Sequence, residues 1–489
     1  MYYIQPNDRS QVTIANSLDD MIPQEHYVRL IDFLIESVVK RNESLFMTKG
    51  LAKTGRKPYH PATLLKLYLY GYLNRVNSSR RLETECKRNI EMKWLLGNLV
   101  PDHKTISDYR RENGEQINYV VVQFNQMLKQ NGYLKIETLS IDGSKIRANA
   151  NKSVFDKDIE KRIKNLEQEI GHYMTELDKN DHAEGMEEDI EQLEKRQEEL
   201  KVNIEKLEKE IVQLREQKEA LSKGNQWKFS PTDPNARLMH SREGNHYAYN
   251  IQAAIDKENK LIAALEVSTQ PNDQAQLMPM VETLKKYYQT IPKEILADAG
   301  YSNLNDIKKI EQQEKITCYV GLNGNPRLVD NRKQDSSFTY LPEKDMYLCS
   351  QGQPLVVTRK NKNNNKRGTT ATIYTGTNCS PCLIKNLCTS GKARNLVRFS
   401  DQEWRDKHRN KMNSETGKQK LKLRMMMSEH PFGTLKLWMG KLPIKLRGIR
   451  KVQTEMNIYH LAYNFKRMLT IESMENLRDM FMKFKWRIA

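Results

Sequence analysis

The 489-residue sequence predicts a protein of mixed α/β class, with a helical N-terminal region and a long helical hairpin inserted into a sheet. Three observations predict it. Apolar residues follow helical spacing through residues 1–130, short strand-like apolar runs occur between residues 136 and 320, and heptad spacing fills much of residues 156–222.

Residues 1–130 are predicted to form a helical DNA-binding domain. Ile31, Leu34 and Val38 share one helical face, and Pro61 opens a later helix. From Pro101 onward, the sequence predicts a short capped helix that ends in arginines. This pattern is typical of a DNA-binding helix-turn-helix motif and equally of an ordinary surface helix. Its candidate DNA contacts are Lys104, Arg110 and Arg111.

The charge of the chain favours a polyanionic partner. The formal net charge is +18, although residues 156–222 hold 21 acidic and 12 basic residues, leaving +27 on the rest. Double-stranded DNA is the expected partner of such a chain. No run of about 18 apolar residues predicts a membrane span, and the start MYYIQPNDRS does not predict a secretory signal, so we expect a cytoplasmic, nucleoid-associated protein.

The acidic segment, residues 156–222, is predicted to be a coiled-coil insertion. Its later seam runs from Leu193 to Leu221 in alternating steps of four and three, and a shorter seam runs from Ile159 to Leu177. A polar break at residues 179–185 separates the two seams. They predict two antiparallel helices, which either fold back on each other or contribute to a homodimer.

Residues 131–155 and 223–320 are predicted to form the first part of the catalytic core. Strands are expected at residues 136–142, 246–256, 261–268, 294–298 and 316–320, with a helix at residues 273–288. This order is compatible with an RNase H-like sheet.

Two aspartates are predicted to stand at the ends of buried strands. Asp142 ends the run Leu-Ser-Ile-Asp, and Asp298 follows Ile-Leu-Ala. Each could be a turn cap, but side by side they could bind hard divalent cations through oxygen. Glu429 is the candidate third acid, because Lys436, seven residues on, returns to its helix face; Pro431 predicts a kink or a helix start nearby.

Residues 321–400 are predicted to be an irregular, basic insertion that contains cysteines. Cys349, Cys379, Cys382 and Cys388 could hold a structural zinc ion or be reduced thiols, whereas Cys86 and Cys318 are expected in the core. Residues 401–489 are predicted to be the helical C-terminal part of the catalytic domain, with a basic DNA-facing surface that includes Arg447 and Arg450.

Several of these blocks together resemble one known family. Ile-Asp142-Gly-Ser-Lys, Leu-Ala-Asp298-Ala-Gly-Tyr, and Glu429 with Lys436 are similar to the three catalytic blocks of bacterial insertion-sequence transposases of the DDE class. Thr232–Leu238, Tyr249–Gln252 and the helical N-terminal region also resemble that family, so the likeness spans about residues 59–468. The chain departs from the family's usual glutamate block in having four residues between Arg424 and Glu429. Glu455 is therefore kept as the alternative third acid.

The resemblance implies an RNase H-like catalytic domain in which Asp142, Asp298 and Glu429 hold two Mg²⁺ or Mn²⁺ ions. It places Arg424 and Lys436 near the DNA backbone. The implied activity is cleavage at terminal inverted repeats and joining of the 3′-OH ends to target DNA by a protein that is a homodimer on DNA. The alternatives are an RNase H-like nuclease without strand transfer and an inactive protein that binds DNA ends.

Overall fold

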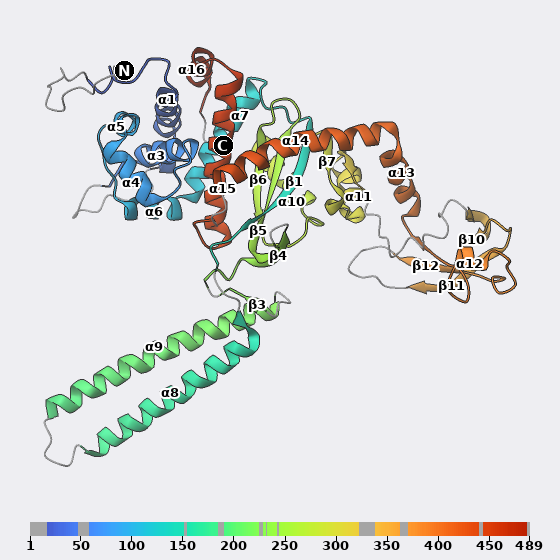
Figure 1. The fold of residues 1–489 in the computed structure, drawn as a ribbon, viewed down its shortest axis with the longest axis horizontal. Coiled ribbons are helices and arrows are strands. Elements are labelled where there is room, and N and C mark those ends of the chain that lie inside the picture. The colour runs from blue at the N-terminus through green and yellow to red at the C-terminus, as the bar shows by residue number, and fades with distance from the viewer. Residues whose placement is uncertain are drawn as a thin grey trace, which may run out of the picture.

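The computed structural model describes residues 17–46, 58–150, 154–183, 190–223, 228–230, 232–241, 244–321, 338–361, 370–439 and 444–486. The N-terminal helices lie beside a central sheet, a two-helix hairpin projects from it, and a second, small sheet lies at the end away from the N-terminal helices (Figure 1). One apolar core extends from the N-terminal helices through the central sheet to the C-terminal helices.

Helices form the described part of residues 1–130, as predicted. They are α1 (Tyr27–Lys40), α2 (Glu43–Phe46), α3 (Pro61–Leu73), α4 (Ser79–Arg88), α5 (Ile90–Leu96), α6 (His103–Glu112) and α7 (Gly114–Gln130). The predicted starts of α3 and α6 are present. His60 Nδ1 accepts a hydrogen bond from the N–H of Ala62, with Pro61 in the first turn of α3, and Asp102 Oδ1 accepts the N–H groups of Lys104 and Thr105.

The central sheet has the strand order β6–β5–β1–β7–β8. The central strand β1 (Thr138–Arg147) pairs antiparallel with β5 (Gly244–Asp256), which pairs antiparallel with β6 (Ile262–Ser268). On its other side, β1 is parallel to β7 (Glu294–Ala297), and β7 is parallel to β8 (Thr317–Val320). β4 (Arg237–Ser241) pairs with the first half of β5. This order is that of an RNase H-like sheet and confirms the predicted fold class.

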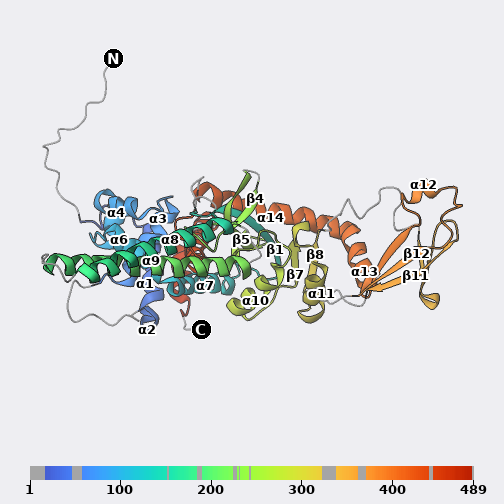
Figure 2. The ribbon, with the colours of Figure 1, turned by 90° about the horizontal axis from the view of Figure 1, so that it is seen from below.

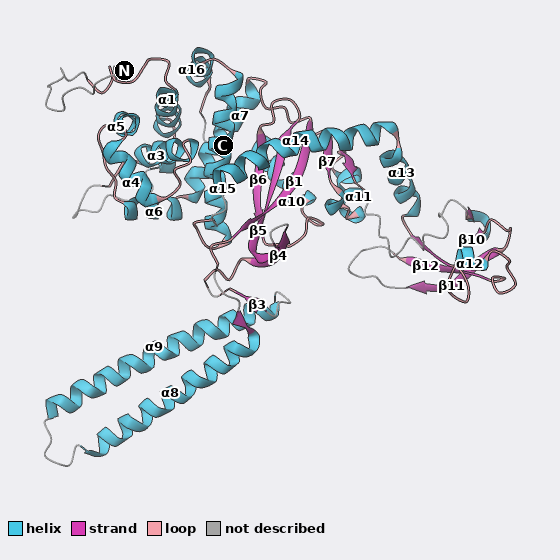
Figure 3. Ribbon diagram, viewed as in Figure 1, coloured by secondary structure: helices cyan, strands magenta, loops and turns pink. Residues whose placement is uncertain are grey.

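Helices from both halves of the chain cover the sheet (Figure 3). α7 and the C-terminal α15 (Ile449–Ile471) pack together, and α15 packs on β6, where Asn464 Oδ1 accepts the N–H of Ile262 at 2.8 Å. α10 (Leu277–Tyr288) packs on β6 and α11 (Leu304–Gln313) on β8. α14 (Glu415–Met439) crosses β1, β7 and β8, and α16 (Met474–Lys483) packs on α1.

The acidic insertion is a helical hairpin, which confirms the predicted element. α8 (Asp156–Ala183) and α9 (Ile190–Lys223) pack against each other, and Figure 2 shows them side by side from a second direction. Ion pairs join them at Arg162–Glu210, Arg196–Glu176, Arg215–Glu167 and Lys218–Glu160. Two short strands, β2 (Val154–Phe155) and β3 (Lys228–Phe229), pair at its base. The hairpin therefore folds back on itself, and the homodimer stays a prediction.

The prediction that residues 321–400 are irregular is wrong for their described part. Residues 338–361 and 370–399 contain an antiparallel sheet in the order β13–β12–β11–β10–β9, with a small core formed by Phe338, Leu355, Tyr374 and Leu396. Its elements are β9 (Thr339–Leu341), η3 (Pro342–Lys344), β10 (Met346–Leu348), β11 (Pro354–Asn361), β12 (Ala371–Gly376), α12 (Lys385–Cys388) and β13 (Asn395–Phe399). α13 (Gln402–Asn413) leads from this sheet to α14.

Three predicted boundaries also differ. β1 continues past Asp142 to Arg147, because β5 pairs with it over that whole length. α10 begins at Leu277 rather than at residue 273. α14 runs through Pro431 and neither starts nor ends there, although proline removes one backbone hydrogen bond of a helix. Met427 and Phe432, on either side of the proline, are buried and hold the helix against the rest of the protein. None of the helices in the described part of the chain has the length and apolar composition that a membrane span needs.

Candidate active site

Asp142 and Asp298 lie at the same edge of the central sheet. Asp142 is two residues beyond Ser140, the last residue of β1 that pairs with β7, and Asp298 directly follows β7. The strand β7 thus ends where both aspartates lie. Asp298 also begins the short helix η1 (Ala299–Tyr301), and its Oδ1 accepts the N–H of Gly300 at 2.8 Å. Adjacent parallel strands therefore bring the two aspartates together, although Asp142 is within its strand.

Arg424 of α14 reaches both carboxylates. Its Nη2 lies 3.6 Å from Asp142 Oδ2 and 3.8 Å from Asp298 Oδ2. The side chains of Arg424 and Asp142 are 15% and 20% exposed, so the pair is largely shielded from solvent, whereas Asp298 is 41% exposed. The two carboxylates thus face one common space, which α14 closes on one side.

The environment of Asp142 opposes its ionisation. Burial raises the pKa of the Asp142 carboxyl above its usual range, and the negative charge of Asp298 raises it further. Arg424, the N–H of Gly143 and the Ser428 hydroxyl lower this pKa. A cation is therefore the kind of ligand that two such neighbouring carboxylates accept.

The donor atoms suit a hard divalent cation, which prefers carboxylate oxygen. Within the described residues, however, no three His, Cys, Asp or Glu side chains gather closely enough to hold a metal ion. Asp142 and Asp298 are thus two oxygen donors of the right chemistry, with Arg424 supplying the positive charge beside them. A third acidic ligand has to approach for a complete set.

Glu429 lies on α14 one residue after Ser428, and its side chain is exposed. The residues of α14 that reach Asp142 are Arg424 and Ser428. Glu429 therefore neighbours the site in the chain, but the described structure does not group it with the two aspartates. Its part as the third acid stays a prediction.

Glu455, the fallback third acid, is a structural residue. It is 1% exposed on α15, and its Oε2 accepts the N–H groups of Lys445 and Leu446, both at 3.0 Å. Its Oε1 lies 3.9 Å from the Arg110 guanidinium. These contacts join α15 to α6 and to the segment before α15, so Glu455 already has a full set of partners.

The same contacts correct the prediction for Arg110. Its side chain is 5% exposed, and Nη1 donates to the Tyr72 hydroxyl at 2.7 Å and the Asn77 carbonyl at 3.3 Å. A buried guanidinium committed in this way does not face DNA. The terminal arginines of α6 point differently, since the next residue, Arg111, is exposed.

The other predicted DNA contacts differ in exposure. Arg424 faces the aspartates rather than solvent. The remaining ones have exposed side chains and stay candidates: Lys104, Arg111, Lys436, Arg447 and Arg450.

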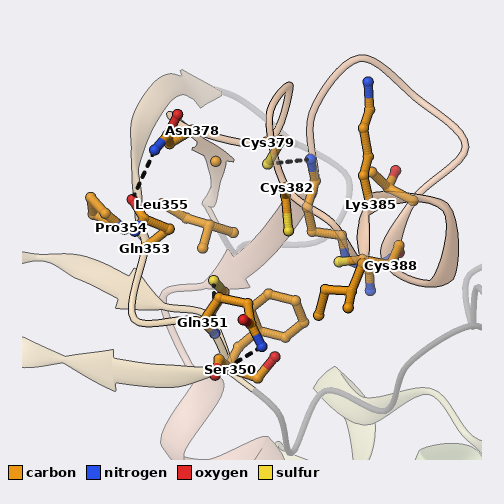
Figure 4. A pocket seen from close by; sticks show the side chains of 16 residues that line it. Ser350, Gln351, Gln353, Pro354, Leu355, Asn378, Cys379, Cys382, Lys385 and Cys388 are labelled. Carbon is orange, nitrogen blue, oxygen red and sulfur yellow. Dashed lines mark hydrogen bonds between the residues drawn. The ribbon is translucent and has the colours of Figure 1, made fainter.

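Cys349, Cys379, Cys382 and Cys388 line one cavity of about 30 Å³ in the small sheet. Backbone N–H groups of Gln351 and Arg394 donate to Cys349 Sγ and Cys379 Sγ, at 3.4 and 3.5 Å (Figure 4). The sulfurs do not form a zinc ligand set in the described structure. The four cysteines thus share a cavity, and zinc binding stays a prediction. Cys86 and Cys318 are buried in the core, as predicted.

The sequence interpretation missed Asp273, which lies beside both aspartates in the loop between β6 and α10. Its Oδ1 accepts hydrogen bonds from Asn250 Nδ2 and Gln252 Nε2, each at 2.7 Å. The available signal was the polar pair Asn272-Asp273 in the loop after the strand that ends at Ser268, together with the polar residues of the Tyr-Asn-Ile-Gln motif in β5.

Two family models match the chain. A transposase domain model matches residues 16–112, and a transposase DDE domain model matches residues 348–469, which include α14 and Glu429. Together the two matches support an insertion-sequence DDE transposase. DDE transposase domains generally use divalent metal ions, which agrees with the oxygen donors of Asp142 and Asp298. In this transposase both aspartates precede the matched DDE segment.

Other similarities to this transposase are weaker. No curated protein sequence matches the chain. A solved structure of the piggyBac transposase synaptic complex with hairpin DNA is similar at a TM-score of 0.33 and 11% sequence identity, over 93% of this chain and 79% of that chain. At this TM-score the two chains need not share a fold.

Proposed function

We propose that this transposase binds the terminal inverted repeats of its insertion sequence, cleaves the DNA there by metal-dependent phosphodiester hydrolysis, and joins the 3′-OH ends to target DNA. The observation that carries the proposal is the pairing of Asp142 and Asp298 with one arginine at the edge of an RNase H-like sheet. Water attacks phosphorus and breaks its bond to O3′. The freed 3′-OH then attacks a phosphorus atom of the target, which forms a new bond to the element end, breaks the bond of that phosphorus to the target's O3′ and releases a target 3′-OH.

Asp142, Asp298 and Glu429 are the proposed ligands of two Mg²⁺ or Mn²⁺ ions. Such ions supply the positive charge that activates the attacking oxygen and stabilises the departing one. The rigid strand β1 and the capped turn of Asp298 hold two of the carboxylates in place. Arg424 holds them together by charge when α14 lies across the sheet.

The proposed DNA contacts lie outside this carboxylate pair. Residues 1–130 are the proposed DNA-binding domain, with Lys104 and Arg111 exposed on α6. Lys436, Arg447 and Arg450 are exposed in the C-terminal part, residues 401–489. Two copies on one pair of ends are the proposed assembly, with one active site at each end.

Strand transfer distinguishes this proposal from a nuclease of the same fold. Pre-cleaved element ends with free 3′-OH groups are expected to join a supercoiled plasmid in the presence of Mg²⁺ or Mn²⁺. Agarose gels of labelled ends measure the joined product. Ends that carry a 3′-deoxy terminus are the control, because they lack the attacking oxygen. Cleavage of intact ends without any joining would identify a nuclease instead.

Replacing Glu429 by glutamine is expected to reduce cleavage of end DNA by about 100-fold, since the carboxylate charge at the third ligand position is lost. Its side chain is exposed, so the unfolding midpoint is expected to stay unchanged. Gel assays of cleavage and urea unfolding measure the two effects. Glu415→Gln, also exposed on α14, is the matched control. Wild-type cleavage by Glu429→Gln would remove Glu429 from the site.

A further inference from the structure

Asp273 is held against the candidate site from the other side of Gly143. It lies in the loop that leads from β6 to α10, outside the sequence motifs that resemble the family. Both hydrogen bonds that its side chain accepts, from Asn250 and Gln252, go to Oδ1. Gln252 is directly opposite Gly143 in the β1–β5 pairing. The carboxylate of Asp273 is thereby fixed next to the residue that follows Asp142.

The glycines beside the two aspartates show how close this approach is. A Cβ atom on Gly143 would lie 2.5 Å from Asp273 Oδ1 and 2.5 Å from Gln252 Nε2. A Cβ atom on Gly300 would lie 2.9 Å from Asp298 Oδ1 and 3.4 Å from Asp273 Oδ2. A side chain at residue 143 would therefore displace Asp273. The glycine there leaves room for a third carboxylate between the Asp142 strand and the Asp298 turn.

Tyr301 lies near the same three acids. Its hydroxyl donates to Gln252 Oε1, so the turn after Asp298 is tied to the side chain that holds Asp273. Burial raises the pKa of Tyr301 well above its usual value, and the negative charges of Asp273, Asp142 and Asp298 raise it further. All three carboxylates are thus near one buried hydroxyl.

A buried oxygen beside these acids has no partner. Asn250 is 1% exposed, and its Nδ2 donates to Asp273 Oδ1 and to the Gln270 carbonyl. These two acceptors fix the orientation of the amide. Its Oδ1 makes no hydrogen bond and lies 3.0 Å from the Cβ position of Gly143. An unpaired carbonyl oxygen beside Gly143 and Asp273 is a group that a cation can satisfy, whereas a further hydrogen-bond acceptor cannot.

We propose that Asp273 is a positioning residue of the divalent-cation site, which lies against Gly143 and Gly300 beside Asp142 and Asp298 and adds a further negative charge next to a bound cation. The inference rests on the proposed function, because it concerns the same metal site. It differs from the predicted triad, since Asp273 comes from the loop before α10 and not from α14.

Direct Mn²⁺ binding to the full-length protein without DNA tests this inference. The free Mn²⁺ signal in electron paramagnetic resonance gives the Kd for the wild type and for Asp273→Asn, Asp142→Asn and Glu282→Gln. Asp273→Asn keeps an oxygen that can accept from Asn250 and Gln252, and changes chiefly the charge. Glu282→Gln removes an exposed charge from α10, the helix that follows Asp273, and is the matched control.

The Kd of Asp273→Asn for Mn²⁺ is expected to rise by about 10- to 100-fold, while Glu282→Gln binds like the wild type. Urea unfolding without metal checks that the fold is kept, and Asp273→Glu, which restores the charge, is expected to recover part of the affinity. A Kd for Asp273→Asn within twofold of the wild type would overturn the inference if Asp142→Asn loses binding. Unchanged binding by Asp142→Asn would instead overturn the proposed function.

Discussion

Replacing Asp142 or Asp298 by alanine is expected to lower cleavage of element-end DNA by on the order of 10³-fold or more. Both carboxylates lie beside one arginine and are proposed to hold the cations, whose charge stabilisation is worth several kcal/mol in the transition state. Binding of the same DNA is expected to be nearly unchanged, since the proposed DNA contacts lie elsewhere. Gel assays of cleavage and mobility shift measure the two effects.

Asp406→Ala is a matched control for these two variants, because Asp406 is a partly exposed aspartate on α13 whose ion pair is with Arg409, away from the sheet edge. It is expected to cleave like the wild type. Cleavage at a wild-type rate by both Asp142→Ala and Asp298→Ala would rule out the metal-site proposal. Loss of DNA binding by either would show that these carboxylates support the fold of the DNA-binding surface instead.

Breaking the buried pair between α6 and α15 is expected to destabilise the protein by about 3–5 kcal/mol. Arg110→Ala leaves Glu455 buried without its cation, and Glu455→Ala leaves the N–H groups of Lys445 and Leu446 without their acceptor. Both residues are at most 5% exposed, so water cannot replace the lost partner. Urea unfolding followed by circular dichroism measures the loss.

Arg111→Ala is the control on the same helix. Arg111 is 45% exposed and pairs with Asp108 and Glu112 at the surface, so its removal is expected to cost about 1 kcal/mol or less. Equal effects of Arg110→Ala and Arg111→Ala on stability would contradict the buried-pair interpretation. A defect of Arg110→Ala in DNA binding alone, at full stability, would restore Arg110 as a DNA contact.

Much of the fold could be predicted from local pattern. The heptad seams predict α8 and α9 because coiled-coil contacts repeat along the chain, and the apolar runs before Asp142 and Asp298 predict the buried strands β1 and β7. The small sheet could not be predicted in this way. Its strands are short and separated by polar turns, and four buried residues suffice for its core, so no periodic apolar signal arises.

The site was predictable only where neighbouring strands fix it. Asp142 and Asp298 meet because β1 and β7 are adjacent and parallel. Asp273 depends on a contact across the sheet to Gln252, and the burial of Arg110 depends on Tyr72 and Glu455, which lie 38 and 345 residues away in the chain. Contacts of this kind follow from tertiary packing, which cannot be predicted from the spacing of apolar residues or from helix caps.

The ribbon at the base of the hairpin bears on how the sheet assembles. β1 and β5 are neighbours in the sheet, yet the hairpin and β4 separate them in the chain. α8 and α9 are joined by a short connection and contact each other, so they can pair before the sheet forms. The strands β2 and β3 then pair beside the end of β1. The long loop that β1 and β5 would otherwise have to close becomes a short one. Folding of the hairpin thereby offsets the loop-closure entropy that an insertion of this length adds to the central strand pairing.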